Sequence, residues 1–138
     1  MLKIVIDTNV LISALIQRSY PYLIIYDIFL KDNIQLCVSN DLMKEYYEVL
    51  CRPKFSKYPD FFIRAEAVLA EIDSKSKRYN PTIKLELISD LDDNMILELA
   101  DECLADYIIT GNTNDFTFSA YKQTKIVSPK QFWEEYLN

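Results

Sequence analysis

Short apolar runs alternate with longer segments of helical periodicity along this chain. Residues 3–6 form a continuous apolar run, typical of a strand buried on both faces, and residues 34–38 alternate like a second strand. Two more short strands are expected at 107–110 and 125–127. Strands that alternate with helices predict an α/β fold whose central parallel sheet is covered on both faces.

The predicted helices fill most of the remaining chain. They span residues 10–17, 22–31, 40–52, 92–105 and 129–137, with one or two more helices inside 58–78. Prolines punctuate this pattern, and Pro129 takes the favoured first position of the last helix. Because no repeat, low-complexity tract or Gly/Ser linker divides the chain, we expect a single domain over residues 1–138.

The composition excludes several classes of enzyme. The 138 residues include no histidine and one glycine. The missing histidines exclude Ser-His-Asp and Cys-His catalysis and any zinc site that needs histidine. A single glycine excludes a P-loop and a GxGxxG turn. Cys37, Cys51 and Cys103 form no CxxC motif, so we interpret them as core thiols in a reducing compartment.

Neither a targeting signal nor an apolar run long enough to cross a bilayer is found, which predicts a cytoplasmic location without membrane contact. The net charge of −6 is unevenly spread: residues 85–121 carry nine carboxylates and no lysine or arginine, whereas basic residues gather at 52–57 and 75–78. One segment suits a cation and another suits a polyanion, although solvated helix faces of opposite sign explain the same pattern.

Polar residues follow two of the predicted strands directly. Asp7 comes after the first strand, and Asn112 and Asp115 come after the strand at 107–110. The carboxyl ends of parallel strands share one edge of a sheet, where ligand sites form. A half-buried Asp7 needs a cation or several donors, or else it caps the next helix. Glu45 lies beside the apolar stripe of its helix, as a group that reaches this edge or as a boundary carboxylate packed along the core.

Three aspartates open the helix predicted at 92–105. Capping and the helix dipole account for part of Asp90, Asp92 and Asp93, and the spacing does not choose between Asp92 and Asp93 as the inward-facing one. Asp115 is equally typical of a turn. Together the acidic clusters predict a site for Mg²⁺ or Mn²⁺, which prefer hard oxygen ligands and suit phosphodiester hydrolysis.

Four segments, in order along the chain, resemble the motifs of PIN-domain nucleases. They are residues 4–14 (IVIDTNVLISA), 39–50 (SNDLMKEYYEVL, with RPKF after it), 90–100 (DLDDNMILELA) and 105–112 (ADYIITGN). The likeness extends to VapC-like endoribonucleases, the toxins of prokaryotic type II toxin–antitoxin pairs. It implies a three-layer α/β/α PIN-like domain, Mg²⁺- or Mn²⁺-dependent cleavage of RNA and a protein antitoxin as partner.

The resemblance also assigns roles to residues. It implies Asp7, Glu45 and Asp93 as the metal-binding acids, which selects Asp93 over Asp92. Many family members carry an aspartate directly after Thr-Gly, where this chain has Asn112. The implied catalytic and metal-binding set is Asp7, Glu45, Asp93 and Asp115, with Asn9, Asn112 and Asp90 in supporting positions.

Several alternatives remain open at this stage. Arg52, Lys54 and Lys57 form either an RNA-binding strip, with neighbouring aromatic rings stacking on bases, or a solvated loop. The aromatic stretch 20–29 is either core packing or the groove of a homodimer or antitoxin. The main rival function is a catalytically weak PIN-fold module that binds RNA or protein. A response-regulator phosphoacceptor domain fits the acids less well, and a generic Mg²⁺ phosphatase leaves Glu45 unexplained.

Overall fold

The computed structural model describes residues 1–88, 90–116 and 118–138, with only the backbone of Asp115. Within these residues, six strands form one sheet in the order β3-β2-β1-β4-β6-β5. Neighbouring strands are parallel, except that β5 and β6 form an antiparallel hairpin. The strands are β1 (Lys3–Ile6), β2 (Gln35–Val38), β3 (Lys77–Arg78), β4 (Tyr107–Ile109), β5 (Ala120–Tyr121) and β6 (Thr124–Val127).

Helices connect the strands and cover the sheet on both faces. They are α1 (Thr8–Ile16), α2 (Tyr20–Leu23), the π-helix η1 (Ile24–Phe29), α3 (Asn40–Leu50), the 3₁₀-helix η2 (Pro53–Lys57), α4 (Phe61–Lys75), α5 (Leu91–Cys103), the 3₁₀-helix η3 (Thr113–Asp115) and α6 (Pro129–Leu137). The chain moves in one direction along the sheet from β1 through β2 to β3, and then returns past β1 to β4. Because such crossovers are right-handed, the helices α1–α4 cover one face of the sheet and α5 covers the other.

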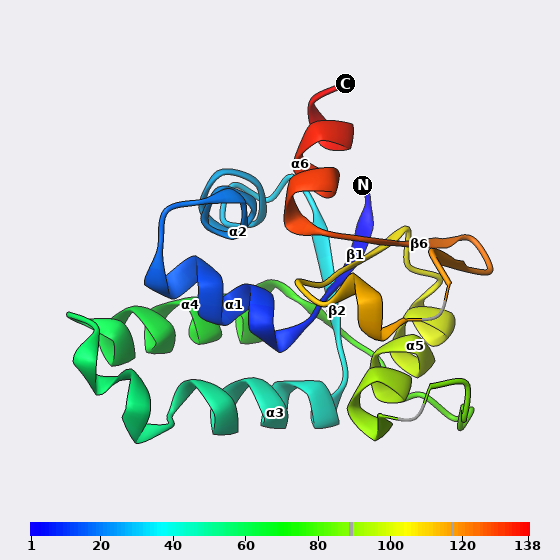
Figure 1. Ribbon diagram of the computed structural model, residues 1–138, viewed down its shortest axis with the longest axis horizontal. Helices are drawn as coiled ribbons and strands as arrows, with labels where there is room; N and C mark the ends of the chain where they lie inside the picture. The colour runs from blue at the N-terminus through cyan, green and yellow to red at the C-terminus, as the bar shows by residue number, and fades with distance from the viewer. Residues whose placement is uncertain (89, 117) are drawn as a thin grey trace.

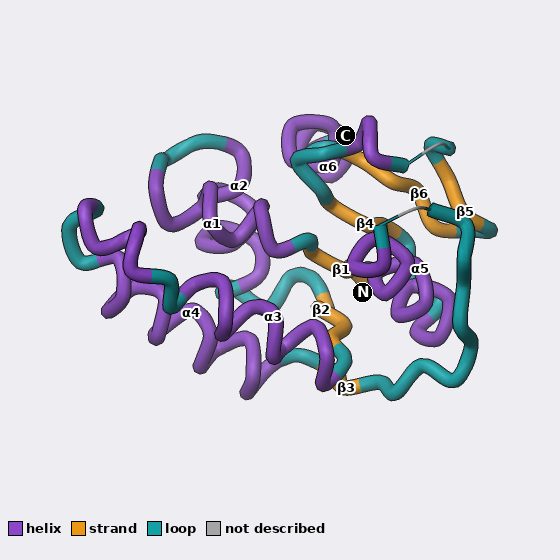
Figure 2. Tube along the Cα trace, turned by 60° about the horizontal axis from the view of Figure 1, so that its bottom comes forward, coloured by secondary structure: helices purple, strands orange, loops and turns teal. Residues whose placement is uncertain are grey.

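The three layers are visible in Figure 1, where β1 and β2 lie between α5 and the pair α1 and α4. This arrangement confirms the predicted α/β/α fold with its largely parallel central sheet. In Figure 2 the long loop after β3 passes outside α5. A hydrogen bond holds this loop against α5, because Leu85 N donates to Glu98 Oε2 at 2.7 Å. No helix in the described part of the chain is both long and apolar enough to traverse a membrane.

The central strands β1 and β4 form much of the hydrophobic core, as their continuous apolar runs predict. Ile4, Val5 and Ile6 of β1 are almost fully buried, and α5 packs on β1, β2 and β4. Tyr46 of α3 is also buried, and its hydroxyl donates to the carbonyl of Ile6. This hydrogen bond ties α3 to the end of β1 from which the next residue, Asp7, projects.

Some predicted boundaries were wrong, for identifiable reasons. Pro21 lies within the first turn of α2, where a missing N–H leaves no bond unmade, so helix begins at Tyr20 and continues as a π-helix. The helix expected to end by residue 78 stops at Lys75, because residues 77–78 pair with β2 as a two-residue edge strand. Cys51 is exposed, which corrects the interpretation of all three cysteines as core thiols.

Candidate active site

Asp7 lies where β1 ends, and its carboxylate joins β1 to β4. The parallel register pairs Ile6 with Ile109, so Asp7 faces Thr110 across the ends of the two strands. Asp7 Oδ2 accepts a hydrogen bond from Thr110 Oγ1 at 2.8 Å, while Oδ1 accepts from Thr8 N at 2.8 Å as the N-cap of α1. The capping role is therefore real, and it leaves the carboxylate positioned at the strand edge.

Asn9 and Gly111 form a second bridge between the same two strand ends. Asn9 Oδ1 accepts from Gly111 N at 2.9 Å, and Asn9 Nδ2 donates to Asp7 Oδ2 at 3.3 Å. A Cβ atom at Gly111 would lie 3.1 Å from Asn9 Oδ1, so the glycine permits this close approach. Asn9 therefore contacts Asp7 directly, and its supporting role in a reaction stays a prediction. Asn112 is exposed, and its backbone N donates to Thr110 Oγ1 at 3.1 Å.

Glu45 reaches the same edge from α3. It is half-buried beside the buried residues Leu42 and Tyr46, and it accepts a hydrogen bond from the hydroxyl of Thr8. Burial is the largest cause that raises the pKa of Glu45 above its usual value; the Thr8 hydrogen bond opposes this shift. The negative charges of Asp92 and Asp7 raise the pKa further. Glu45 therefore lies within electrostatic reach of two other carboxylates.

The first turn of α5 supplies the remaining described acids. Asp90 is its N-cap, and Asp90 Oδ1 accepts from Asp92 N at 2.8 Å and from Asp93 N at 3.4 Å. Asp93 is buried, whereas Asp92 is exposed and is the member of this turn whose charge acts on Glu45. Asp90 thus has a structural capping role, and both Asp92 and Asp93 remain relevant to the site.

A groove of about 330 Å³ runs between α3 and the start of α5. It is lined by Asp41, Lys44, Glu45, Glu48, Val49, Arg52, Asp92 and Met95. Arg52 therefore shares a cavity with Glu45. Lys54 and Lys57 are exposed on η2, which follows α3 directly. Phe55 between them is only 5% exposed, which rules out the base stacking that the sequence suggested for this ring.

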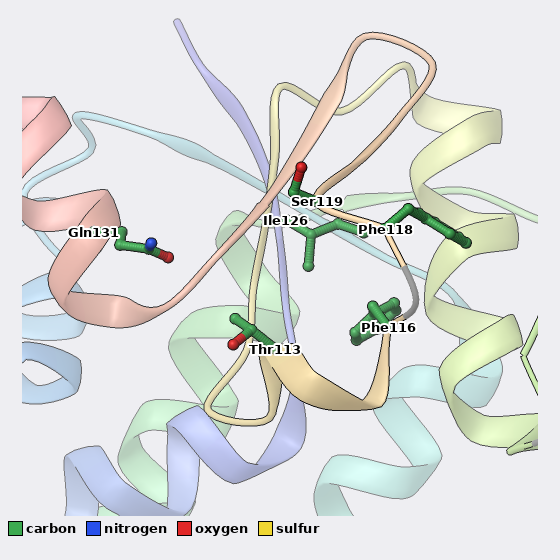
Figure 3. Close-up of a pocket in the computed structure, with 6 residues that line it drawn as sticks. All are labelled: Thr113, Phe116, Phe118, Ser119, Ile126 and Gln131. Atoms are coloured by element: carbon green, nitrogen blue, oxygen red, sulfur yellow. The ribbon is translucent and has the colours of Figure 1, made fainter.

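A separate hollow of about 320 Å³ lies between η3, β5, β6 and α6 (Figure 3). Its described lining residues are Thr113, Phe116, Phe118, Ser119, Ile126 and Gln131. These side chains bring aromatic and aliphatic surface together with three uncharged polar groups. Since none of them is a carboxylate, this hollow is chemically distinct from the edge that holds Asp7 and Glu45.

The donor chemistry of the acidic edge fits a hard divalent ion. Its side chains offer carboxylate, amide and hydroxyl oxygens, the ligands that Mg²⁺ and Mn²⁺ prefer. Across the side chains that the structure describes, however, no three Asp, Glu or Cys residues are grouped closely enough to hold an ion. The side chain of Asp115, expected as a fourth ligand, lies outside the described residues.

Sequence reasoning missed the two threonines that organise this edge. The sequence pattern assigned Thr8 no role at the site and placed Thr110 only at the end of a strand, yet both hydroxyls donate to a carboxylate of the site. The available signal was their position: Thr110 directly follows β4, and Thr8 lies two residues after the end of β1, the parallel neighbour of β4. Knowledge of which strands are neighbours is needed to use that signal.

Comparisons with known proteins place the chain in a family. A sequence-family model described as PIN domain matches residues 3–114. The "Uncharacterized protein MJ1680" of Methanocaldococcus jannaschii is 32% identical over 143 residues, covering 98% of this chain and 92% of that relative. No solved structure matches the chain. PIN domains are generally nucleases and generally use divalent metal ions. This chain belongs to the PIN domain family.

Proposed function

We propose that this chain is an endoribonuclease that depends on Mg²⁺ or Mn²⁺ and hydrolyses RNA phosphodiester bonds beside the ends of β1 and β4. The observation that supports this function best is the meeting of Asp7 and Glu45, joined through Thr8 at the carboxyl ends of the parallel strands. Acidic groups at this position, in a chain of the PIN domain family without histidine, suit carboxylate-based metal chemistry.

Asp7, Glu45 and Asp93 would hold the ion, with Asp115 or Asn112 completing or positioning its shell. When bound, a divalent ion supplies Lewis acidity, an activated water and compensation for charge on the leaving oxygen. The chain's own contribution is orientation: Thr110, Thr8 and Asn9 each donate a hydrogen bond to a site carboxylate and fix its direction. Such preorganisation at the reacting phosphate is a large part of nuclease catalysis.

Arg52, Lys54 and Lys57 would bind the RNA backbone. Arg52 lies in the groove that contains Glu45, and the two lysines are exposed on the segment that follows. Their positive charges would hold phosphates beside the acidic edge, where the carboxylates alone repel RNA. The toxin role within a toxin–antitoxin pair, with a protein antitoxin and a homodimer as partners, is part of the same proposal and draws its support from the resemblance.

A second candidate function is a PIN-fold module that binds RNA or protein without efficient cleavage. The specific observation that favours it is Asn112, which replaces a carboxylate with a neutral amide beside Thr110. Fewer carboxylates weaken the attraction for a second divalent ion. The two functions differ in one measurable property, which is metal-dependent turnover.

Cleavage of a mixture of structured RNAs in Mg²⁺, Mn²⁺ or EDTA tests the proposal. Asp7→Asn, Glu45→Gln and Asp93→Asn should each abolish metal-dependent cleavage while the circular dichroism spectrum stays native. Glu48→Gln is the matched control, because Glu48 lies on the same helix and lines the same groove as Glu45. Cleavage that survives in EDTA or in all three variants would contradict the site. RNA binding without turnover in the native protein would favour the binding module.

A further inference from the structure

Another cavity lies at the opposite end of α1 from Thr8. It measures about 240 Å³ and lies where the end of α1, the α2–η1 segment and α4 meet. Arg18, Tyr22, Tyr26 and Arg64 give the cavity its chemistry, and apolar or amide residues at the end of α1 complete its lining. No carboxylate is among its described lining residues, in contrast to the acidic groove beside α3.

The two tyrosines and Arg18 form a layered platform. The rings of Tyr22 and Tyr26 have centroids 4.5 Å apart at an interplanar angle of 31°, and Arg18 Cζ lies 5.5 Å from the centroid of the Tyr22 ring. Both rings are partly exposed. Partly exposed aromatic rings and guanidinium groups are the kind of surface on which single-stranded nucleic acids stack their bases.

The second arginine faces the platform from α4. Arg64 lines the same cavity, and its positive charge acts on Tyr26, opposing the rise in the pKa of this phenol that burial causes. Arg64 Nη2 donates to the carbonyl of Pro59 at 3.3 Å, which leaves other donors of the guanidinium for a ligand. The ion pairs found among the described residues involve neither Arg18 nor Arg64, so two guanidinium charges share one cavity without a carboxylate partner there.

We propose that this cavity binds one nucleotide of the RNA substrate, with its base stacked on Tyr22 and a phosphate between Arg18 and Arg64. The inference rests on the proposed function, since it assigns a subsite to that nuclease. Two guanidiniums in the lining of one cavity favour a phosphodiester over an apolar protein segment.

The geometry of α1 relates this subsite to the acidic edge. Thr8 contacts Glu45, and Ala14 lines the cavity six residues later. At ~1.5 Å per residue, these positions are separated by ~9 Å along the helix axis. This distance corresponds to ~3 nucleotides at the ~3.4 Å rise of a stacked strand. The nucleotide held at Tyr22 would therefore fix which bond, a few positions along the strand, reaches Asp7 and Glu45.

An RNA-binding assay in EDTA tests the subsite without turnover. It measures the fluorescence anisotropy of fluorescein-labelled eight-nucleotide oligoadenylate and oligouridylate at several salt concentrations. Arg18→Gln and Arg64→Gln should each weaken binding about fivefold to tenfold and lower the salt dependence by ~0.7 in log–log slope. Tyr22→Ala should weaken binding about tenfold, and Tyr22→Phe should restore it because the stacking face is retained. Lys130→Gln, on the exposed face of α6, controls for the loss of one positive charge.

Photocrosslinking with a 4-thiouridine oligonucleotide provides an independent readout. A nucleotide in the cavity should attach to the tryptic peptide of residues 19–31, which contains Tyr22 and Tyr26. The subsite would be overturned if the pocket variants bound RNA as tightly as Lys130→Gln and crosslinks formed only outside residues 19–31. That outcome would favour a protein as the occupant of the cavity. Binding in EDTA is measured without turnover, so the two proposals can fail separately. If the native protein cuts no RNA but the pocket variants still bind RNA more weakly, the nuclease proposal is refuted and the nucleotide site is retained.

Discussion

The contact between Asn9 and Gly111 predicts that the effect of Gly111→Ala on stability depends on Asn9. The substitution should destabilise the native protein and stabilise a variant in which Asn9 is replaced by alanine. Gly111 does not have a positive φ, so alanine fits the backbone there. Replacing glycine by alanine at a compatible position stabilises by ~0.5 kcal/mol through the unfolded chain. The new Cβ atom, however, would lie 3.1 Å from Asn9 Oδ1 and displace an acceptor that now sits 2.9 Å from Gly111 N. Loss of that hydrogen bond costs ~1 kcal/mol, so Gly111→Ala should destabilise by ~0.5 kcal/mol net.

A double-mutant cycle measured by urea unfolding tests this prediction. Its four proteins are the native chain, Gly111→Ala, Asn9→Ala and the variant that carries both substitutions. With a slope of ~2 kcal/mol per molar, Gly111→Ala should lower the native midpoint by ~0.25 M. In the Asn9→Ala background the Cβ has open space, so the same substitution should raise the midpoint by a similar amount. The two effects differ by ~1 kcal/mol, which is the expected coupling energy. Equal effects in both backgrounds would refute the claim that this contact joins the two strand ends.

Three further predictions concern stability. Asp90→Ala should cost ~1 kcal/mol in urea unfolding, because two first-turn amides of α5 lose their acceptor. Tyr46→Phe should cost ~1–3 kcal/mol, because the buried carbonyl of Ile6 loses its donor. The hydrogen bond to Glu135 raises the pKa of Tyr107 from 10.0 to about 12, so its stabilisation should be full below pH 10 and lost as the pH rises through 12. Tyr107→Phe should remove this part of the alkaline decline, as thermal melts against pH would show.

The main features of the fold could be predicted because burial on both faces leaves a direct mark on sequence. The strands β1, β2, β4 and β6 were predicted within about one residue of their bounds, since each is a short apolar or alternating segment. The strands β3 and β5 were missed because each has two residues and is exposed or at an edge, where no apolar pattern is required. Their pairing depends on neighbours that only the tertiary structure supplies.

The sequence predicted which strand ends and helix place acidic residues near one another, but it did not predict their contacts. Strand-end logic brought Asp7 and residues 110–112 to one edge, and helical spacing placed Glu45 at the core boundary, where it lies half-buried. Spacing could not show that Thr8 binds Glu45, because that contact joins α1 to α3 across 37 residues. It could not separate Asp92 from Asp93 either, since both belong to one helical turn and differ in burial only through what packs around them.

The acidic segment between residues 85 and 121 suggested one cation-binding surface, but its carboxylates serve different purposes. Glu98 is buried, accepts from the backbone of the loop after β3 and pairs with Lys84. Asp101 pairs with Lys122 at 3.0 Å, and Asp106 accepts from Lys3 N at 2.8 Å. These acids hold loops and strand ends in place, and a lysine compensates the charges of Glu98 and Asp101 locally.

Local compensation explains how a chain of net charge −6 can suit an RNA partner. Screening limits an exposed charge to about 8–10 Å at physiological salt, so a phosphate responds to nearby groups and hardly to the total. Near α1 and α3 these groups include the guanidiniums of Arg18, Arg64 and Arg52, which line two cavities. A polyanion that runs along α1 would therefore meet positive charge at the arginine cavity and carboxylates only at the strand edge. At that edge the repulsion would favour entry together with a divalent cation, so the charge pattern agrees with the metal dependence proposed above.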